Sequence, residues 1–243
     1  MCGFFAFSTG MSSRQLADLF QLTNLPGSLE DIESLKYFPK SLIPTVSKNS
    51  PNQLIMRYWS LIPRWWTKDL TELKFSTFNA RSEDITQKAS YKAPWTNSQR
   101  CLIPATWFYE FQARQTNQNS KKVTKIPHRV EVEDQPIFTM AGLYETWTDS
   151  QSNVMETVAI ITAEASDALR PIHPRQPVII SPEDRGMWLD KETTPQEAMQ
   201  LMRATEELKI AEIDQEFNRA FGDEVTPDLV APAKNSAQSG LFN

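Results

Sequence analysis

The chain has 243 residues, of which 40% are apolar and 23% charged, and its formal net charge is −5. These values are typical of a soluble globular protein with one large domain or two small ones, and the acidic balance argues against a broad nucleic-acid-binding face. The sequence contains neither a membrane-spanning apolar run nor a basic signal segment, and two cysteines make no disulfide framework. We therefore expect a cytoplasmic protein with no membrane partner.

Runs rich in β-branched and aromatic residues predict that most of the regular structure is strand. The expected strands span residues 4–8, 54–61, 74–81, 100–111, 128–132, 137–144, 157–162 and 178–180. Helices are expected over residues 14–22, 84–93, 163–170 and 196–208. The last of these follows a capping box that Thr194 and Glu197 would form. Turns are expected at Pro44 and over residues 133–136, and a polar loop over residues 112–125.

No linker or repeat divides this pattern. We expect one domain over residues 1–232, followed by a disordered tail rich in Ala, Ser and Asn over residues 233–243. The tally of elements predicts an α+β fold, in which mainly antiparallel sheets curl into a barrel-like core with helices at the periphery.

The first chemical signal is the start of the chain, Met1-Cys2-Gly3. A small second residue permits removal of the initiator methionine, which would leave Cys2 with an α-amine and a thiol on adjacent carbons. Their ordinary pKa values, about 7.7–8.0 for the amine and about 8.5 for the thiol, leave both nucleophiles partly available near neutral pH. Such a residue can attack an acyl group through sulfur, or condense with an aldehyde through nitrogen and close a thiazolidine ring. The alternative is an inert cysteine behind the start codon.

Glu110 and His173 are the candidate acid–base groups. Glu110 interrupts an apolar and aromatic run, where an ionised carboxylate is costly unless it is paired, protonated or lines a pocket. His173 lies between two prolines, and an imidazole titrates near neutral pH. Each has a structural alternative, an ion pair with an arginine for Glu110 and an ordinary turn for His173. His128, at an expected strand start, is interpreted as structural.

Asn79 and Arg81 lie at the end of an expected strand. An asparagine there could orient a reacting carbonyl or hydroxyl, and an arginine could hold a phosphate through two hydrogen bonds. The structural alternatives are an asparagine that caps a turn and an Arg81 that pairs with Glu83.

Trp65, Trp66 and Phe111 are candidate stacking platforms for unpaired bases if they rim a cleft, and core residues if they do not. The two histidines and two cysteines match no metal-ligand spacing, and the sequence has no glycine-rich phosphate loop. The sequence therefore predicts neither a metal nor a cofactor.

Eight short motifs in a fixed order resemble the SOS response-associated peptidase family. The resemblance covers roughly residues 2–232 and depends on the order and spacing of the set. The motifs are Met1-Cys2-Gly3, Trp59-Ser60-Leu61-Ile62-Pro63, Asn79-Ala80-Arg81-Ser82-Glu83, Arg100-Cys101-Leu102-Ile103-Pro104-Ala105, Phe108-Tyr109-Glu110-Phe111, Ala141-Gly142-Leu143-Tyr144-Glu145, Ile161-Thr162 and His173-Pro174-Arg175-Gln176-Pro177.

The resemblance implies covalent attachment to single-stranded DNA at an abasic site, in response to DNA damage. The Cys2 amine would attack the ring-opened sugar aldehyde to give a Schiff base, and the Cys2 thiol would close a thiazolidine. Asn79 would position the sugar, Glu110 would move protons, and His173 would assist ring opening or reversal of the link. The resemblance also implies a peptidase-like removal of Met1.

The same resemblance implies a set of DNA contacts. Arg81 and Arg175 would clamp backbone phosphates. The partners would be single-stranded DNA with abasic sites and junctions of single-stranded with duplex DNA, bound by a monomer in a bacterial cytoplasm. The remaining members of the DNA-contacting set are Trp65, Trp66, Phe111, Gly3 and Pro44.

Three positions depart from the family pattern. Phe4 stands where the family usually has arginine, which removes one cationic DNA contact. Phe111 stands where the family usually has tryptophan, which leaves less area for stacking. The usual His-Asp-Arg-Met-Pro reads His-Pro-Arg-Gln-Pro at residues 173–177, which could shift the histidine loop. Together with the acidic charge, these changes predict weaker DNA binding that depends steeply on salt.

Two other classes of function stay open. A glutamine amidotransferase with an N-terminal nucleophile also begins Met-Cys-Gly, but it needs an oxyanion hole, commonly built there with an Asn-Gly pair, and this sequence has no Asn-Gly. A single-strand-binding module with an inert Cys2 would bind undamaged strands and form no covalent species.

Overall fold

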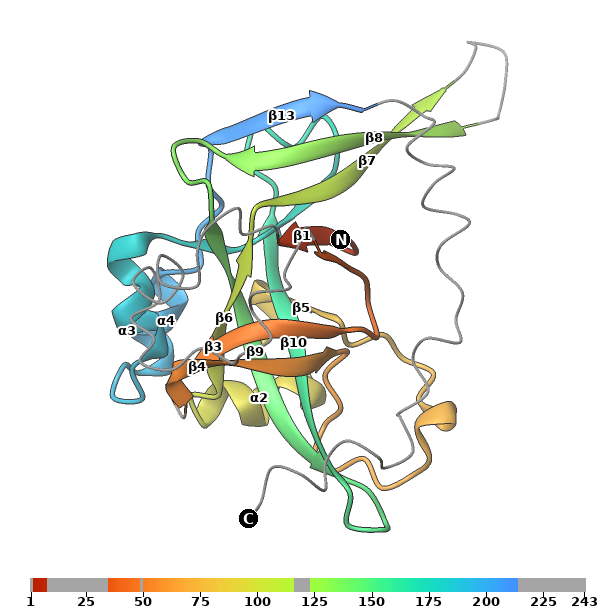
Figure 1. Ribbon diagram of the computed structural model, residues 1–243, viewed down its shortest axis with the longest axis vertical. Helices are drawn as coiled ribbons and strands as arrows, with labels where there is room; N and C mark the ends of the chain where they lie inside the picture. Colours follow the sequence, from red (N-terminus) through yellow and green to blue (C-terminus); the bar gives the residue numbers. More distant parts are fainter. Residues whose placement is uncertain (1, 8–34, 49, 116–122, 214–243) are drawn as a thin grey trace. The chain divides into compact units, whose positions relative to one another are not determined.

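The computed structural model describes residues 2–7, 35–48, 50–115 and 123–213, which belong to one compact unit, Met1–Ile213 (Figure 1). The strands are β1 (Phe5–Phe7), β2 (Leu35–Tyr37), β3 (Leu42–Ser47), β4 (Ser50–Trp59), β5 (Asn79–Arg81), β6 (Arg100–Ala105), β7 (Trp107–Gln115), β8 (Val123–Val132), β9 (Phe138–Thr148), β10 (Val154–Glu164), β11 (Arg175–Pro177), β12 (Ile179–Ile180) and β13 (Leu208–Glu212). The helices are α2 (Ala89–Thr96), α3 (Arg185–Leu189) and α4 (Pro195–Gln200), with short 3-10 turns η2 (Leu70–Glu72), η3 (Ser82–Asp84) and η4 (Pro182–Asp184).

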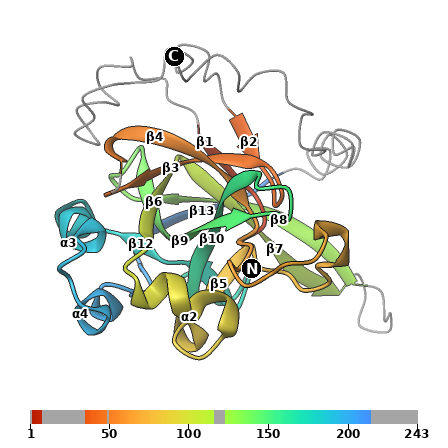
Figure 2. The same ribbon diagram turned by 90° about the horizontal axis from the view of Figure 1, so that it is seen from below.

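A closed five-stranded barrel forms the core. The strands β10, β4, β3, β6 and β9 form a ring, because β10 pairs with β4 on one side and with β9 on the other. Most of β9 and β10 is buried along its length, which is typical of strands covered on both faces. Figures 1 and 2 place α2, α3 and α4 at the periphery of these strands. The expected α+β fold with a barrel-like, mainly antiparallel core is therefore confirmed.

A second sheet, in the order β13-β8-β7-β1-β2, carries the start of the chain. The single strand expected over residues 100–111 is wrong, because the chain leaves the barrel at Thr106 and continues in this second sheet as β7. The backbone N–H of Thr106 donates to the carbonyl of Ala6 (2.9 Å), and β7 then pairs with β1. This change of sheet places the second half of the run beside the N-terminal strand.

Three other expected elements are wrong, and tertiary pairing explains two of them. Pro44 lies buried within β3, opposite Met56, and not in a turn. The helix expected over residues 196–208 ends at Gln200, and Leu208 begins β13, which pairs with β8. Residues 163–170 contain the end of β10 and turns, and no helix.

The remaining boundaries shift or lie outside the described residues. The helix expected from residue 84 begins at Ala89, and β7 and β8 occupy both ends of the expected loop over residues 112–125. The capping box of Thr194 and Glu197 is confirmed at the start of α4. The helix expected over residues 14–22, the domain end at residue 232 and the tail over 233–243 lie outside the described residues. No helix within the described ranges is long and apolar enough to cross a membrane.

Candidate functional site

The N-terminal strand buries Cys2. Strand β1 is held between β7 and β2, with Phe5 opposite both Phe108 and Tyr37. The backbone N–H of Tyr109 donates to the Phe4 carbonyl (3.0 Å), which extends this pairing toward the start of the chain. Cys2 has no exposed surface as a result. A nucleophile at this position reacts inside the protein, where bulk water is largely excluded.

Phe4 occupies a stack of three aromatic rings. Its ring lies between those of Phe38 and Tyr109, with centroid distances of 4.5 and 4.4 Å and interplanar angles of 2° and 8°. The residue is 5% exposed. At this position, where the resemblance leads us to expect arginine, the chain supplies apolar packing that anchors the N-terminal segment and carries no positive charge.

Asn79 contacts the N-terminal segment directly. Its strand, β5, pairs with β10 on the barrel, and the Asn79 Nδ2 atom donates to the carbonyl of Cys2 (2.8 Å). The Asn79 Oδ1 atom is buried and has no hydrogen-bond partner among the described residues. A buried acceptor without a partner is costly unless a ligand or water satisfies it. The Asn79 amide is therefore oriented by the protein, and its Oδ1 atom stays an acceptor without a partner among the described residues.

Glu110 and His173 form a pair whose carboxyl group acts electrostatically on Cys2. Glu110, on β7, is 3% exposed, and its Oε2 atom lies 3.7 Å from Nδ1 of His173. Burial raises the pKa of Glu110 to about 7. Burial also raises the pKa of the Cys2 thiol far above its ordinary value, and the negative charge of Glu110 adds to this shift. Burial lowers the pKa of His173. Near neutral pH the site therefore holds a protonated thiol, a neutral imidazole and a carboxyl group close to half ionisation.

The loop over residues 173–177, here called the His173 loop, is fixed by its own side chains. The His173 Nδ1 atom lies 2.8 Å from the Arg175 carbonyl oxygen and 3.1 Å from the Arg175 backbone nitrogen. Gln176 is buried, accepts from the backbone N–H of Ser166 (2.9 Å) and donates to the carbonyl of Thr205 (3.2 Å). The glutamine that departs from the family pattern thus ties this loop to two neighbouring segments.

The two candidate phosphate clamps differ in their surroundings. The guanidinium of Arg175 forms an ion pair with Glu83 through both carboxylate oxygens and donates to the Thr162 carbonyl (2.7 Å). Arg81 is exposed and makes no side-chain hydrogen bond or ion pair with another described residue. The alternative pairing of Arg81 with Glu83 is therefore wrong, because Arg175 takes that carboxylate.

Two of the three aromatic candidates, Trp65 and Trp66, form a surface cluster with Phe75, a residue that the sequence motifs do not indicate. Trp65 is 50% exposed, and Phe75, the missed residue, is 40% exposed. Their ring centroids lie 6.4 Å apart, and Phe75 lies 5.6 Å from Trp66. Phe111 is exposed on β7, next to Glu110.

The other two residues of the expected DNA-contacting set lie at different depths. Gly3 is partly buried beside Cys2. Pro44 is buried in β3, so its side chain offers no outer surface to a DNA strand. The burial of Pro44 follows from its place in the barrel strand β3, between the buried residues Ile43 and Thr45.

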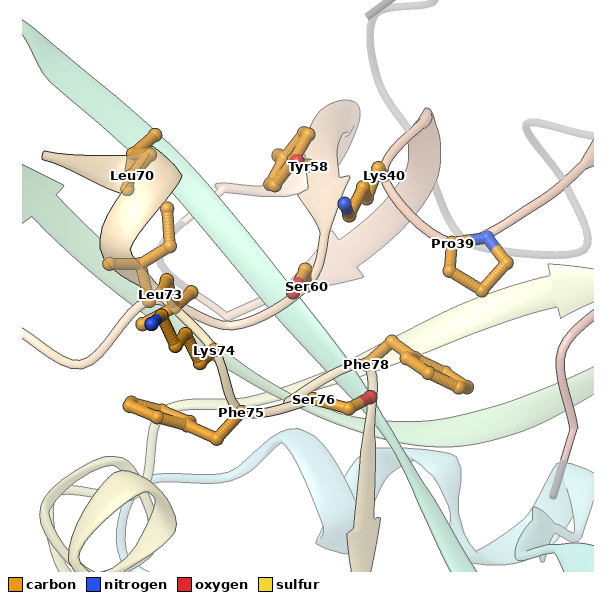
Figure 3. Close-up of a pocket in the computed structure, with 11 residues that line it drawn as sticks. Pro39, Lys40, Tyr58, Ser60, Leu70, Leu73, Lys74, Phe75, Ser76 and Phe78 are labelled. Atoms are coloured by element: carbon orange, nitrogen blue, oxygen red, sulfur yellow. The ribbon is translucent and has the colours of Figure 1, made fainter. Parts of the chain in front are cut away.

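A cavity of about 370 Å³ opens beside the aromatic cluster (Figure 3). Its wall includes Phe75 and also Phe78, the residue before Asn79. None of the described residues form a group of three or more His, Cys, Asp or Glu side chains that could hold a metal ion. The side-chain groups near Cys2 are its own thiol, the carboxyl of Glu110, the imidazole of His173 and the amide of Asn79.

Comparison with known proteins agrees with these motifs. The family model described as SOS response associated peptidase (SRAP) matches residues 1–220. The abasic site processing protein YoaM of Bacillus subtilis (strain 168) is 32% identical over 201 residues, which are 82% of this chain and 84% of YoaM. The abasic site processing protein HMCES of Rattus norvegicus is 31% identical over 197 residues, which are 72% of this chain and 55% of HMCES.

A solved structure supports the fold independently. The crystal structure of a protein from Bacteroides thetaiotaomicron superimposes with a TM-score of 0.75 at 24% identity, and the match covers 94% of this chain and 97% of that protein. Similarity at this level of identity establishes the fold alone. On the family match over residues 1–220, the chain belongs to the SOS response associated peptidase family.

Proposed function

We propose that this protein processes abasic sites in single-stranded DNA by linking Cys2 covalently to the opened sugar. The observation that carries the proposal is the meeting of Asn79, Glu110 and His173, from three distant segments, around a buried Cys2. The names of YoaM and HMCES, both abasic site processing proteins, support the same substrate.

In this proposal Met1 is removed first, and the freed Cys2 amine is the first nucleophile. The amine nitrogen attacks the sugar aldehyde carbon to form a carbinolamine, which loses its hydroxyl group as water to give an imine. The thiol sulfur then attacks the imine carbon, and the thiol proton ends on the nitrogen as the thiazolidine closes. Because burial keeps the thiol protonated, the amine attacks before the sulfur does. The only peptidase activity that we propose for this protein is the removal of its own Met1.

Glu110 supplies the proton transfers. A carboxyl with a pKa of about 7 gives a proton to the departing hydroxyl group and accepts one from the attacking nitrogen at similar cost. The neutral imidazole of His173 takes a proton from the sugar hydroxyl as the ring opens. The open acceptor of Asn79, Oδ1, receives a hydrogen bond from the sugar. The roles of Glu110 and His173 use the protonation states that their surroundings favour near neutral pH.

We expect the DNA strand to follow the exposed Arg81 side chain and the aromatic rings named below. Arg81 contacts a backbone phosphate, and Trp65, Trp66 and Phe111 offer faces to unpaired bases. Arg175 is left out of the phosphate contacts because Glu83 already neutralises it. A monomer acting at a single strand, or at its junction with duplex DNA, is part of the same proposal.

The test is incubation with a single-stranded oligonucleotide that carries one aldehyde-bearing abasic site, followed by a denaturing gel. The wild-type protein should give a species that resists denaturant, and Cys2→Ala should give none. Cys2→Ser is the matched control: like Cys2→Ala it keeps the amine and lacks the thiol, so both variants should give a link only when the imine is reduced with borohydride. A Cys2→Ala variant with full yield of a stable link would refute the proposal. Release of ammonia from glutamine, or binding with no covalent species, would favour the two other classes.

A further inference from the structure

His173 ends a turn that begins at Ser166, here called the 166–173 turn. The carbonyl of Ser166 accepts from the backbone N–H groups of Leu169 (3.2 Å) and Arg170 (2.9 Å). The carbonyl of Leu169 in turn accepts from the backbone N–H of His173 (3.0 Å), and the Leu169 side chain is buried in the core. The turn is therefore a series of linked hydrogen bonds, and whatever fixes its two ends also fixes the place of the imidazole.

The side chain of Gln176 joins the two ends of this turn inside the protein. Gln176 is 1% exposed and lies on β11, three residues after His173, where it pairs with Ala163 of β10. Its Oε1 atom accepts from the backbone N–H of Ser166 (2.9 Å), at the start of the turn. Its Nε2 atom donates to the carbonyl of Thr205 (3.2 Å), in the segment that precedes β13. One buried side chain thus connects three parts of the chain.

The segment before β13 holds the same turn a second time. The carboxylate of Glu206 accepts from the backbone N–H groups of Asp167 (3.2 Å) and Ala168 (3.3 Å), in the first half of the 166–173 turn. Glu206 directly follows Thr205, the residue to which Gln176 donates. Loss of the Gln176 side-chain contacts would therefore loosen this second connection as well.

These buried contacts outweigh the exposed hydrogen bond between the turn and the strand of Glu110. Gln112, two residues after Glu110 on β7, donates to the carbonyl of Pro171 (3.0 Å), but this pair is exposed. Water can replace an exposed hydrogen bond, whereas a buried N–H or carbonyl that loses its partner stays unpaired, which costs more. The separation of 3.7 Å between His173 Nδ1 and Glu110 Oε2 therefore depends mainly on Gln176.

This separation matters when the abasic sugar opens. In that step the imidazole of His173 takes the proton of the C1 hydroxyl group, and the electron pair of that O–H bond forms the aldehyde carbonyl. The bond from C1 to the ring oxygen breaks, and the ring oxygen takes a proton from Glu110. The step leaves a protonated imidazole beside an ionised carboxylate, so its rate depends on how closely the two groups are held together.

We propose that Gln176 is a positioning residue for sugar opening, which acts by holding His173 against Glu110 through the 166–173 turn. The inference deepens the proposed function and depends on it. Gln176 is too deeply buried to contact DNA. It also gives a role to one departure from the family pattern. The methionine usual at this position has a similar length but cannot donate or accept the two hydrogen bonds that this chain uses.

The test compares two oligonucleotides, each at saturating concentration. One carries an ordinary abasic sugar, which must open before it reacts, and the other carries an open-chain aldehyde without the hydroxyl group that closes the ring. Gln176→Met should slow link formation with the first about 10-fold and with the second less than 2-fold, because only the first needs the positioned imidazole. Gln196→Met, at an exposed glutamine of α4, is the matched control and should slow neither.

Two further variants separate positioning from general damage to the fold. Gln176→Glu keeps the shape and the acceptor for the Ser166 N–H, and should give the same selective slowing to a smaller extent. In a His173→Ala background, which lacks the imidazole, Gln176→Met should cause no further slowing.

Equal slowing with both oligonucleotides, slowing with neither, or further slowing in the His173→Ala background would overturn the inference. If the open-chain aldehyde still links to Cys2 in any of these cases, the proposed function stands and only the role of Gln176 fails. If the wild-type protein links neither oligonucleotide through Cys2, the proposed function itself fails.

Discussion

Replacing Glu110 by glutamine should make the protein more stable above neutral pH, while slowing formation of the link. Burial raises the pKa of this carboxyl from 4.5 to about 7, so the folded chain keeps a proton in this range that the unfolded chain has released. The stability that the protonated carboxyl contributes is fully present below about pH 4.5. It is lost as the pH rises through about 7.

The size of the effect follows from the two pKa values. A difference of about 2.5 pH units, at about 1.36 kcal/mol for each unit, gives a loss of roughly 3 kcal/mol when ionisation is complete. Glutamine has nearly the same shape and no proton to lose. The advantage of Glu110→Gln over wild type in free energy of unfolding should therefore grow by about 2–3 kcal/mol between pH 5 and pH 8.

Urea unfolding at the two pH values, followed by tryptophan fluorescence, measures this change. Glu164→Gln is the matched control, because Glu164 is exposed at the end of β10. Its difference from wild type should be the same at both pH values. If the advantage of Glu110→Gln stays constant or shrinks as the pH rises, Glu110 is ionised throughout, as in the ion-pair alternative, and its role as a proton shuttle fails.

Three further substitutions test other parts of the account. Glu83→Gln should slow link formation, because it releases Arg175 and so loosens the loop that carries the His173 imidazole. The salt dependence of DNA binding should stay unchanged. A gain in DNA affinity would instead mark Arg175 as a phosphate clamp. Arg81→Ala should weaken binding to all DNA sequences alike and lower the slope of log K against log salt concentration by about 1. Arg203→Ala, an exposed control, should change neither. If Arg81→Ala and wild type have equal slopes, Arg81 does not contact the DNA. Gly142→Ala should lower the free energy of unfolding, measured in urea, by about 1–3 kcal/mol, because the added Cβ would lie 2.8 Å from the Cys101 sulfur atom. Unchanged stability would show that the neighbouring side chains move to make room for the methyl group.

The sequence predicted those elements whose position depends on neighbouring residues alone. The capping box at Thr194 places the start of α4, and the burial of Phe108 and Tyr109 in β7 follows from their run of apolar residues. The change of sheet at Thr106 and the strand at residues 208–212 depend on partners far away in the chain, β1 and β8. No window of sequence around either segment contains those partners, so the local pattern could not predict them.

In the candidate site, too, local sequence indicates single residues, whereas their contacts depend on distant parts of the chain. An isolated carboxylate at Glu110 and a cysteine at the start are visible as chemical anomalies in the sequence. Their meeting with Asn79 and His173 was expected only through the family resemblance, because β5 and the His173 loop reach Cys2 across the fold. The pairing of Glu83 with Arg175 and the share of Phe75 in the cavity were missed, since each depends on side chains from separate segments.

The central claim is that Cys2, freed of Met1, bonds to the sugar through nitrogen and sulfur. The most direct measurement is mass spectrometry of the peptide that remains on an abasic oligonucleotide after linking and proteolysis. We expect a peptide that begins at Cys2 and carries the sugar with the loss of one water. A link on an internal lysine, or on a peptide that still begins with Met1, would contradict the claim.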